Sequence, residues 1–501
     1  MLRREQTDTG PGKRFSCELS LRSKKCSRNR ADVKLRLCPA EKVSHRRDYA
    51  SSRASEWLSH DGPSECEKLI YLRMAERSQR TSRIAFQYPN FRYYQSARFL
   101  AIAAAEMQSV AVGWQVYEIT KRPLDLGLVG LAQFLPGILL FLVAGHAADR
   151  LPRKRIIFVC YAGFMTCSVL LLYFTVHGLH SVRPIYIVLV LIGVVRAFNG
   201  PSGQAFVPLL VPEEHFPNAV AWGSTFFQAA TILGPTLGGV LYGLSGGAEI
   251  VYGGAAAAFF IAWILIGMIR VQAIQRPRGG ASAQTVLAGF RYVFENKLVL
   301  GAISLDLFAV LLGGAVALLP VYAREILSVG PWGLGILRSA PGVGAVIMAV
   351  TLAHHPLKRR AGVVMLWCVA GFGTFTIVFG LSRNIVLSLI ALFLIGACDM
   401  VSVIIRSTMV QLATPDEMRG RVSAVNMIFI GASNEFGQFE SGITAQWFGT
   451  VRAVVLGGIG TLIVVGLWAR FFPELRKVNE LTPALKKVLP EEPNITADPN
   501  D

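Results

Sequence analysis

Charged residues are scarce in this sequence of 501 residues. Lys, Arg, Asp and Glu make up 16% of it, whereas the apolar set AVILMFWYC makes up 52% and the mean hydropathy is +0.46. A soluble domain has about 25% charged residues, so this composition argues against a cytosolic multidomain enzyme. The apolar content also excludes disorder, and the 48 glycines show no three-residue period, which excludes collagen. The remaining class is a membrane protein, in which glycine permits close helix packing.

Catalytic and metal-binding patterns are scarce as well. The chain has eight cysteines; those in the first 92 residues match no zinc spacing, and the others lie in apolar segments as small hydrophobes. No phosphate loop of Walker type, no H-E-x-x-H and no G-x-S-x-G is present, so ATP-driven pumping and hydrolysis have no basis. We therefore expect no enzymatic activity, no metal and no cofactor.

Residues 1–92 differ from the rest of the chain. They hold 21 Lys and Arg against 11 Asp and Glu, which is +10 of the total +18, and they contain no long apolar run. We expect a basic, disordered cytoplasmic tail; an arm that binds nucleic acid or anionic lipid is the alternative, and no nucleic-acid partner is expected. Met74 opens a normal short basic lead into the first membrane helix, which leaves open that residues 1–73 are a start-site artefact.

Twelve apolar runs follow, each of the roughly 20 residues needed to cross about 30 Å of hydrocarbon. They predict an all-α integral membrane protein with twelve transmembrane helices. The predicted helices are 95–119, 126–148, 156–177, 184–205, 219–243, 249–270, 298–323, 333–353, 362–381, 385–405, 421–445 and 452–472. The expected organisation is a six-helix half at 93–271, a cytoplasmic linker at 272–297, a second half at 298–472 and a polar cytoplasmic tail at 473–501.

The loops predict the orientation. Twelve crossings place both ends of the chain on one side, and the connections on that side contain 14 Lys and Arg residues against six on the other. Basic loops remain in the cytoplasm. We therefore expect a multi-pass protein of the plasma (inner) membrane with both termini cytoplasmic.

The two halves resemble each other at an offset of 205 residues. Several matches at nearly one offset, including a proline at the same depth and a basic loop after it, indicate a duplicated six-helix unit. The matched pairs are Val116-Tyr117 with Val321-Tyr322, Gly130 with Gly335, Pro136-Gly137 with Pro341-Gly342, and 153–155 with 358–360. Such paired halves hold a substrate site between them near the bilayer midplane and expose it alternately to each side.

The loop after the second predicted helix reads GHAADRLPRKR. It resembles the major facilitator superfamily signature G-x-x-x-D-R/K-x-G-R-K/R, although Pro152 stands where that family usually has glycine, which puts the tight-turn role of that position in doubt. The residues in register are Gly145, Asp149, Arg150, Arg153 and Lys154. As a gate, Asp149 would accept N–H groups at the start of helix 11, and Arg153 would pair with an acidic group. The alternative is that the basic cluster only fixes the topology.

Further sequence segments support this resemblance, which covers residues 90–472. GPTLGG at 234–239 resembles the G-P-x-x-G-G element of exporters in the superfamily, and MRGRVSAVN resembles the subgroup that contains the enterobactin exporter and macrolide-efflux-like permeases. Pro235 would kink its helix, while glycines would permit close contact with the opposite half. Ordinary small-residue packing is the alternative to this hinge or seal. Its residues are Gly234, Pro235, Gly238 and Gly239.

We select eight ionisable residues in or next to the predicted spans as functional candidates, because burial of a charge at membrane depth is expensive. They are Glu106, Arg196, Asp306, Arg338, Asp399, Arg406, Glu435 and Glu440. Arg196 matches a residue of the superfamily and is the cation that we expect inside the membrane. Because desolvation favours the neutral form of a carboxylate, these acids could carry protons. Aromatic candidates for a cavity include Trp114, Phe134, Phe227 and Phe436.

Particular alternatives remain for these charges. We expect Glu440 rather than Glu435 to couple protons, because Gly437 and Ser441 beside it indicate a close approach; a structural hydrogen bond is the alternative for either. Glu106 and Asp306 could bind a proton or substrate, or pair with an arginine. Arg406 is seven residues after Asp399, too far to pair within the helix, and near the predicted cytoplasmic end it could simply snorkel.

The pattern therefore predicts a secondary active exporter that moves an organic small molecule, siderophore-like or drug-like, against entry of protons. A symporter or lipid flippase of the same fold is the alternative, and a polytopic membrane enzyme or sensor is a more distant one. The expected partners are a small-molecule substrate, protons and the lipid bilayer. The sequence does not indicate an oligomeric state, and a monomer is compatible with it.

Overall fold

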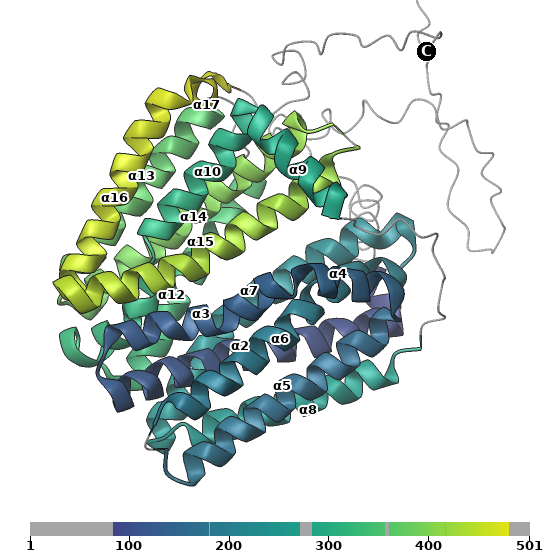
Figure 1. Ribbon diagram of the computed structural model, residues 1–501, viewed down its shortest axis with the longest axis vertical. Helices are drawn as coiled ribbons and strands as arrows, with labels where there is room; N and C mark the ends of the chain where they lie inside the picture. The colour runs from purple at the N-terminus through teal and green to yellow at the C-terminus, as the bar shows by residue number, and fades with distance from the viewer. Residues whose placement is uncertain (1–83, 180, 271–282, 356–359, 416, 480–501) are drawn as a thin grey trace, which may run out of the picture. The chain divides into compact units, whose positions relative to one another are not determined.

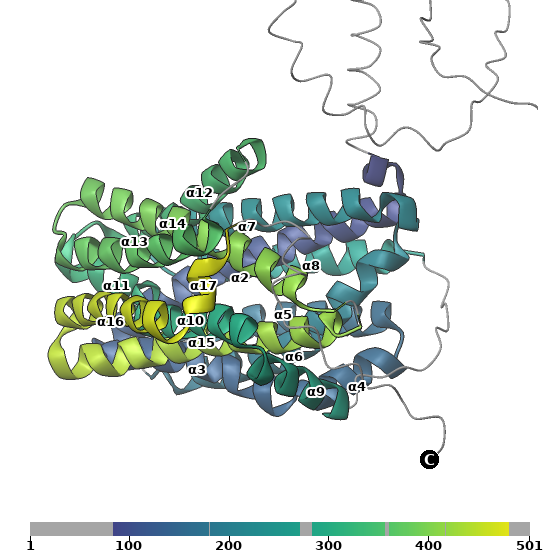
Figure 2. The same ribbon diagram turned by 90° about the horizontal axis from the view of Figure 1, so that it is seen from above.

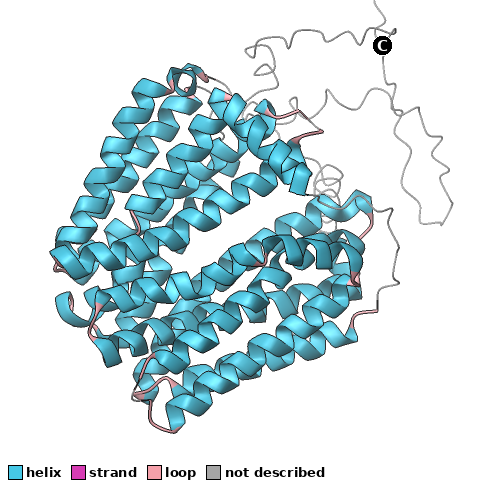
Figure 3. Ribbon diagram, in the orientation of Figure 1, coloured by secondary structure: helices cyan, strands magenta, loops and turns pink. Residues whose placement is uncertain are grey.

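The computed structural model describes residues 84–179, 181–270, 283–355, 360–415 and 417–479. These residues form helices joined by short loops, with no strand among them (Figure 3). The chain divides into units 1–76 and 77–501, and every described residue lies in the second. The predicted tail up to residue 83, the question of Met74 and the end of the chain from residue 480 lie outside the described residues.

All six spans predicted for the first half are helical where the structure describes them. The helices α2 to α8 follow a 3-10 turn, η1, and two further turns join α6 to α7. Their bounds are η1 Ile84–Gln87, α2 Pro89–Thr120, α3 Pro123–Leu139, α4 Phe141–Arg150, α5 Arg153–Val176, α6 Arg183–Phe206, η2 Val207–Leu209, η3 Glu213–His215, α7 Phe216–Ser245 and α8 Glu249–Met268.

The second predicted span is interrupted once, at Leu140 between α3 and α4. Pro136 lies inside α3, where its ring cannot donate a backbone hydrogen bond. The hydrogen bonds from Leu140 N to Pro136 O and from Ala144 N to Leu140 O, at 2.9 and 2.7 Å, nevertheless bridge the interruption. The chain therefore continues through it in nearly the same direction.

The second half repeats this organisation, with one long span broken into pieces. Its elements are α9 Ala283–Glu295, α10 Lys297–Leu312, η4 Ala315–Leu318, α11 Leu319–Val321, η5 Tyr322–Ile326, α12 Gly330–His354, α13 Ala361–Leu381, α14 Ile385–Ala413, α15 Arg419–Phe448, α16 Thr450–Phe471 and α17 Pro473–Lys477. Within the seventh predicted span, the first helix, α10, ends just before Gly313-Gly314, because glycine disfavours the helical conformation. Pro320 lies in the first turn of the short helix α11, where a missing N–H costs nothing.

Helix α9 lies inside the segment predicted to be only a linker. One of its faces is buried against the second half: Val293 is fully buried, and Phe290 packs on Phe429 with ring centroids 6.0 Å apart. The Tyr292 hydroxyl donates to the Ala413 carbonyl at 2.8 Å. The sequence reading missed this helix because it is too short to cross a membrane.

Among the described residues, nine helical segments are long and apolar enough to cross a membrane. The predicted spans that fall short are those of α7 and α15, which carry many small and polar side chains, and that of α3, an apolar helix of only 17 residues. These helices lie between the halves, where α7 packs along α12 and α3 along α15 (Figures 1 and 2). The composition of α7 and α15 therefore reflects contact with the opposite half rather than with lipid.

Two glycine crossings join the halves. A Cβ built on Gly239 of α7 would lie 2.6 Å from the Pro331 carbonyl oxygen and 2.8 Å from the Cα of Gly335, both on α12. A Cβ on Gly442 of α15 would lie 3.0 Å from the Cα of Gly127 on α3. Only glycine permits such backbone contact. We call these two crossings the glycine seams.

The structure also shows the repeat. Helices α7 and α15 each contain 30 residues and begin 203 residues apart, at 216 and 419. In each half this long helix packs against the second span of the other half, α12 or α3. The two seams are therefore equivalent elements of one duplicated arrangement.

Candidate functional site

Four charged residues from both halves form a cluster between α2, α6, α12 and α15. These are Glu106, Arg196, Arg338 and Glu435, which we call the central cluster. Arg338 Nη2 lies 3.9 Å from Glu106 Oε2 and donates to Ser109 Oγ at 2.8 Å, so α12 is bound to α2 across the interface. The side chains of Arg338 and Glu106 retain 25% and 33% of their exposure. A solute could therefore still reach them.

Glu435 is the acidic group of this cluster on α15. Arg196 and Arg338 attract its carboxylate electrostatically, and Glu106 repels it. Gln438 donates to Glu435 Oε2 at 3.2 Å, and a Cβ on Gly130 of α3 would lie 3.0 Å from the same oxygen. Glu435 thus faces the opposite half at short range.

Arg196 is the exposed cation of the cluster. It lies on α6 and donates to Gln133 Oε1 of α3 at 3.2 Å. No carboxylate of the described residues lies within ion-pair distance of it. An exposed guanidinium held only by an amide is available to bind an acidic or hydrogen-bonding solute.

An aromatic pair lies beside the charges. Phe134 of α3 and Phe436 of α15 meet across the halves edge to face, with centroids 5.6 Å apart. Phe436 is 42% exposed and could stack on a planar solute. The other aromatic candidates lie elsewhere: Trp114 packs on Tyr242.

Glu440 has a different environment from Glu435. Its Oε1 accepts a hydrogen bond from Thr444 in its own helix at 2.7 Å. The close approach predicted from Gly437 and Ser441 is present, but it joins α15 to its own half: Ser441 donates to the Gly314 carbonyl at 3.1 Å. The features that favoured Glu440 in the sequence therefore describe packing within the second half.

Asp306 and Arg406 form an ion pair within the second half, between α10 and α14. Both side chains are buried, Arg406 with 5% and Asp306 with 11% of its side-chain surface exposed. The snorkelling alternative for Arg406 is therefore wrong, because the guanidinium turns to a buried acid instead of the membrane surface. Asp399 lies on the same helix, beside a pocket that Asp306 also lines.

The loop that resembles the superfamily signature is partly described. Arg153 donates to the Ala205 carbonyl at 2.6 Å and Lys154 to the Gly267 carbonyl at 3.0 Å. These carbonyls lie in the last turns of α6 and α8, where cations are favourable. Among the described side chains, no acid lies within ion-pair distance of Arg153, so its expected acidic partner stays a prediction. Arg150 is exposed and Gly145 half-buried, and the side chain of Asp149 lies outside the described residues.

The GPTLGG element divides its contacts between two partners. Cβ atoms on Gly234 and Gly238 would lie 2.6 Å from Glu106 Cβ and from the Met107 carbonyl of α2, in the same half. Gly239 and the carbonyl of Pro235 instead face α12 of the opposite half. Part of this element therefore makes the expected contact with the other half. Helix α7 remains one continuous helix through Pro235.

A second polar cluster across the halves was missed by the sequence reading. Arg324 of η5 pairs with Glu118 of α2 at 3.2 Å, and Tyr242 donates to Glu118 at 3.1 Å. Tyr117 donates to Glu325, and the Arg324 guanidinium lies 5.4 Å from the centre of the Trp114 ring. We call these residues the inter-half latch. The internal repeat could have indicated this cluster, because it aligns Tyr117 with Tyr322 at equivalent helix ends.

Known proteins share this sequence and fold. Residues 81–498 match the family described as transmembrane secretion effector. The chain is 28% identical over 405 residues to enterobactin exporter EntS of Shigella boydii serotype 4 (strain Sb227), and over 407 residues to that of Escherichia coli (strain SMS-3-5 / SECEC). Each alignment covers 79% of this chain and 95% of the relative.

Solved structures agree on the fold. A bacterial homologue of the human lysosomal transporter Spinster, inward-facing and occupied, superposes with a TM-score of 0.61 at 13% identity, over 78% of this chain and 98% of its own. The nucleoside transporter NupG gives 0.55 at 15% identity, over 77% and 99%. The chain therefore belongs to the transmembrane secretion effector family of the major facilitator superfamily, and it is a multi-pass secondary transporter that exports small molecules.

Proposed function

We propose that this protein exports an organic small molecule from the cytoplasm in exchange for protons, with the central cluster as the shared site. The observation that carries the proposal is that two acids and two arginines from both halves lie in one network, with partial exposure. A network that spans two rigid halves must change when the halves rock. Such a change can exchange a proton for a substrate.

The substrate that we propose is siderophore-like. Two curated relatives are named as exporters of enterobactin, and the cluster here offers the groups such a solute requires. Arg196 supplies a guanidinium without an ion-pair partner among the described residues, and Phe436 supplies a half-exposed ring. Cationic and aromatic groups together suit a planar molecule with acidic or hydrogen-bonding oxygens.

In the proposed orientation both termini lie in the cytoplasm, and the substrate enters the central cluster from the cytoplasmic side. The glycine seams and the inter-half latch lie near ends of α2, α7, α12 and α15 that the basic loops assign to the external side. Closure at that side supports alternating access with the cytoplasmic side open in this conformation. The gate-loop role of Asp149 remains part of this proposal.

Glu435 is the coupling residue that the geometry favours, in place of Glu440. A proton on Glu435 would remove the attraction of its carboxylate for Arg196 and Arg338, and would leave both guanidinium groups more available to a solute. The partners of Glu440 are hydroxyl groups on its own helix, those of Thr444 and Ser441. Competition between a proton and the arginines for one carboxylate is the physical basis of the proposed exchange.

Everted membrane vesicles provide the test. Vesicles with an acidic interior would receive enterobactin, and a pH-sensitive dye would follow the gradient. Wild type and Glu440→Gln should both release protons when the substrate is added, whereas Glu435→Gln should not. Glu440→Gln is the matched substitution on the same helix, and it controls for the loss of a carboxylate and for folding.

Two results would contradict the proposal in different ways. Uptake of labelled enterobactin without proton release in wild type would exclude proton exchange while retaining export. Loss of proton release in Glu440→Gln but not in Glu435→Gln would exclude the central cluster as the coupling site. Vesicles without the protein define the background leak.

A further inference from the structure

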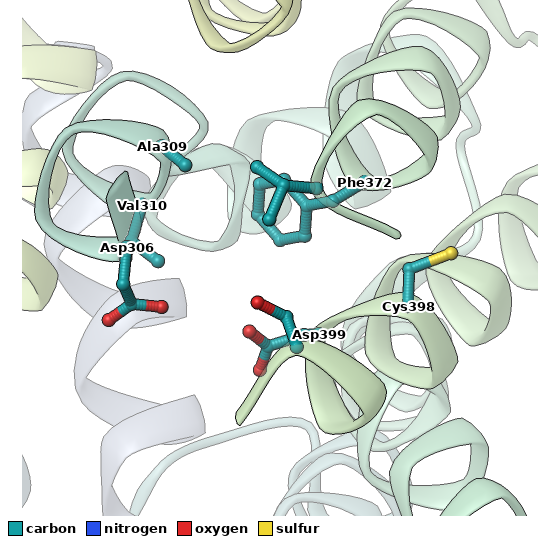
Figure 4. A pocket seen from close by; sticks show the side chains of 8 residues that line it. Asp306, Ala309, Val310, Phe372, Cys398 and Asp399 are labelled. Carbon is teal, nitrogen blue, oxygen red and sulfur yellow. The ribbon is translucent and has the colours of Figure 1, made fainter. Parts of the chain in front are cut away.

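A pocket lies inside the second half, away from the central cluster. Its space, including the part open to solvent, is about 230 Å³. The lining residues come from α10, α13 and α14 and are Asp306, Ala309, Val310, Val369, Phe372, Cys398, Asp399 and Ser402. In Figure 4, Asp306 and Asp399 come from opposite sides of this space, and the Cys398 sulfur points away from them.

The charges around the pocket do not balance. Two carboxylates line it, and the one guanidinium that the structure places beside it, Arg406, pairs with Asp306. Asp399 makes no hydrogen bond or ion pair with any residue that the structure describes. The α13 side of the pocket contributes only Val369 and Phe372, which are apolar. One negative charge is therefore uncompensated at membrane depth, where an ionised side chain is expensive.

A proton compensates this charge better than a metal cation does. Hard cations require about six oxygen ligands, and the pocket side chains offer only two carboxylates and the Ser402 hydroxyl. The guanidinium held by Asp306 would also repel a metal ion. A proton bonds to one carboxylate oxygen and needs no coordination shell, and desolvation favours that neutral form.

We propose that Asp399 is a second proton-binding residue, in a pocket of the second half that the substrate does not enter. The proposal rests on proton-coupled export and adds a site to it. When the proton leaves, a second negative charge faces the Asp306 carboxylate across the pocket. The proton goes to water at the open part of the pocket, and no other bond changes.

The pocket is connected to the interface between the halves. Gly396, three residues before Asp399, packs against the Pro341 carbonyl of α12 with no space for a side chain. Helix α12 in turn forms one glycine seam with α7 and carries Arg338 of the central cluster. A shift of α14 at Asp399 therefore reaches the seam through direct backbone contact.

The first experiment detects the proton without transport. Infrared difference spectra of the purified protein after a pH jump would show loss of a protonated carboxylic acid band in wild type and in Ser402→Ala, which keeps both acids. One component of the band should be lost in Asp399→Asn, which leaves the component of Glu435, and in Asp399→Glu that component should be present but shifted. A band in Asp399→Asn equal to that of wild type would overturn the assignment, as would a wild-type band that responds to sodium at fixed pH.

The second experiment separates this inference from the proposed function. In proteoliposomes, Asp399→Asn should retain exchange of labelled for unlabelled enterobactin without a gradient, but lose accumulation driven by a pH gradient; Asp399→Glu should restore accumulation. Accumulation that persists in Asp399→Asn would overturn the role in coupling. Absence of exchange in wild type would instead count against enterobactin export, while the infrared result would still decide whether Asp399 binds a proton.

Discussion

At the residue scale, the burial of Arg406 shows how an ionic group is tolerated at membrane depth. Its side chain is 5% exposed and pairs with Asp306 on another helix. Taking both charges out of water offsets much of their attraction, so such a pair contributes little net stability. Removing one partner is different, because the other charge then remains buried alone.

Arg406→Gln should therefore destabilise the protein strongly. Breaking a buried pair from one side costs about 3–5 kcal/mol, and the Asp306 carboxylate would be left without its cation. The double variant Asp306→Asn with Arg406→Gln should recover most of the loss. Thermal unfolding in detergent measures both, and equal midpoints for the single and double variants would show that the pair is not the cause.

At the element scale, the inter-half latch joins the end of α2 to η5. Glu118 and Arg324 are 46% and 29% exposed, so water weakens their attraction. An exposed ion pair contributes about 0.2–1 kcal/mol. The latch can therefore bias the closed arrangement of this end without locking it, as an alternating mechanism requires.

Arg324→Ala should shift the halves toward opening at this end. The expected change in the ratio of the two arrangements is about 1.4-fold to fivefold, from the roughly 0.2–1 kcal/mol of an exposed pair. Spin labels on α7 and α12 would report the shift as an increased population of the longer distance. The swapped pair Glu118→Arg with Arg324→Glu should return it toward wild type; a swap that behaves like Arg324→Ala would argue against the ion pair.

At the scale of the whole molecule, two equivalent glycine seams hold the halves together. Each seam brings backbone against backbone, and both are generated by the same duplicated helix pair. Contacts of this kind depend on the absence of side chains rather than on their attraction. The halves can meet only as long as these positions remain small.

Gly239→Val should prevent closure at the seam, since its Cβ would lie 2.6 Å from the Pro331 carbonyl oxygen. Overpacking of this kind costs about 1–3 kcal/mol, and we expect transport of enterobactin to fall sharply. Gly466→Val is the matched control, because that glycine is exposed and a Cβ there meets nothing within 4 Å. Equal transport by the two variants would exclude a role for the seam.

The sequence predicted the helices well and the charged sites less well. Apolar length located the twelve spans because membrane thickness sets it, but the same criterion missed α9, which lies outside that length range. Glu106, Arg196 and Glu435 are in one cluster because helices of both halves converge there, which no single span reveals. The sequence favoured Glu440 because of Gly437 and Ser441, whose contacts lie within one half, and the role of Glu440 stays a prediction. The inter-half latch was missed because Arg324 and Glu325 lie just beyond the predicted span 298–323, and reading each span alone does not show that they meet the end of the first span.

The glycine seams also affect the entropy of each transport cycle. When leucine or methionine side chains close an interface, they lose rotamer freedom, at up to about 1–2 kcal/mol for each side chain. Gly239, Gly335, Gly127 and Gly442 have no rotamers to lose. The seams can therefore part and re-form without ordering side chains at the crossing points.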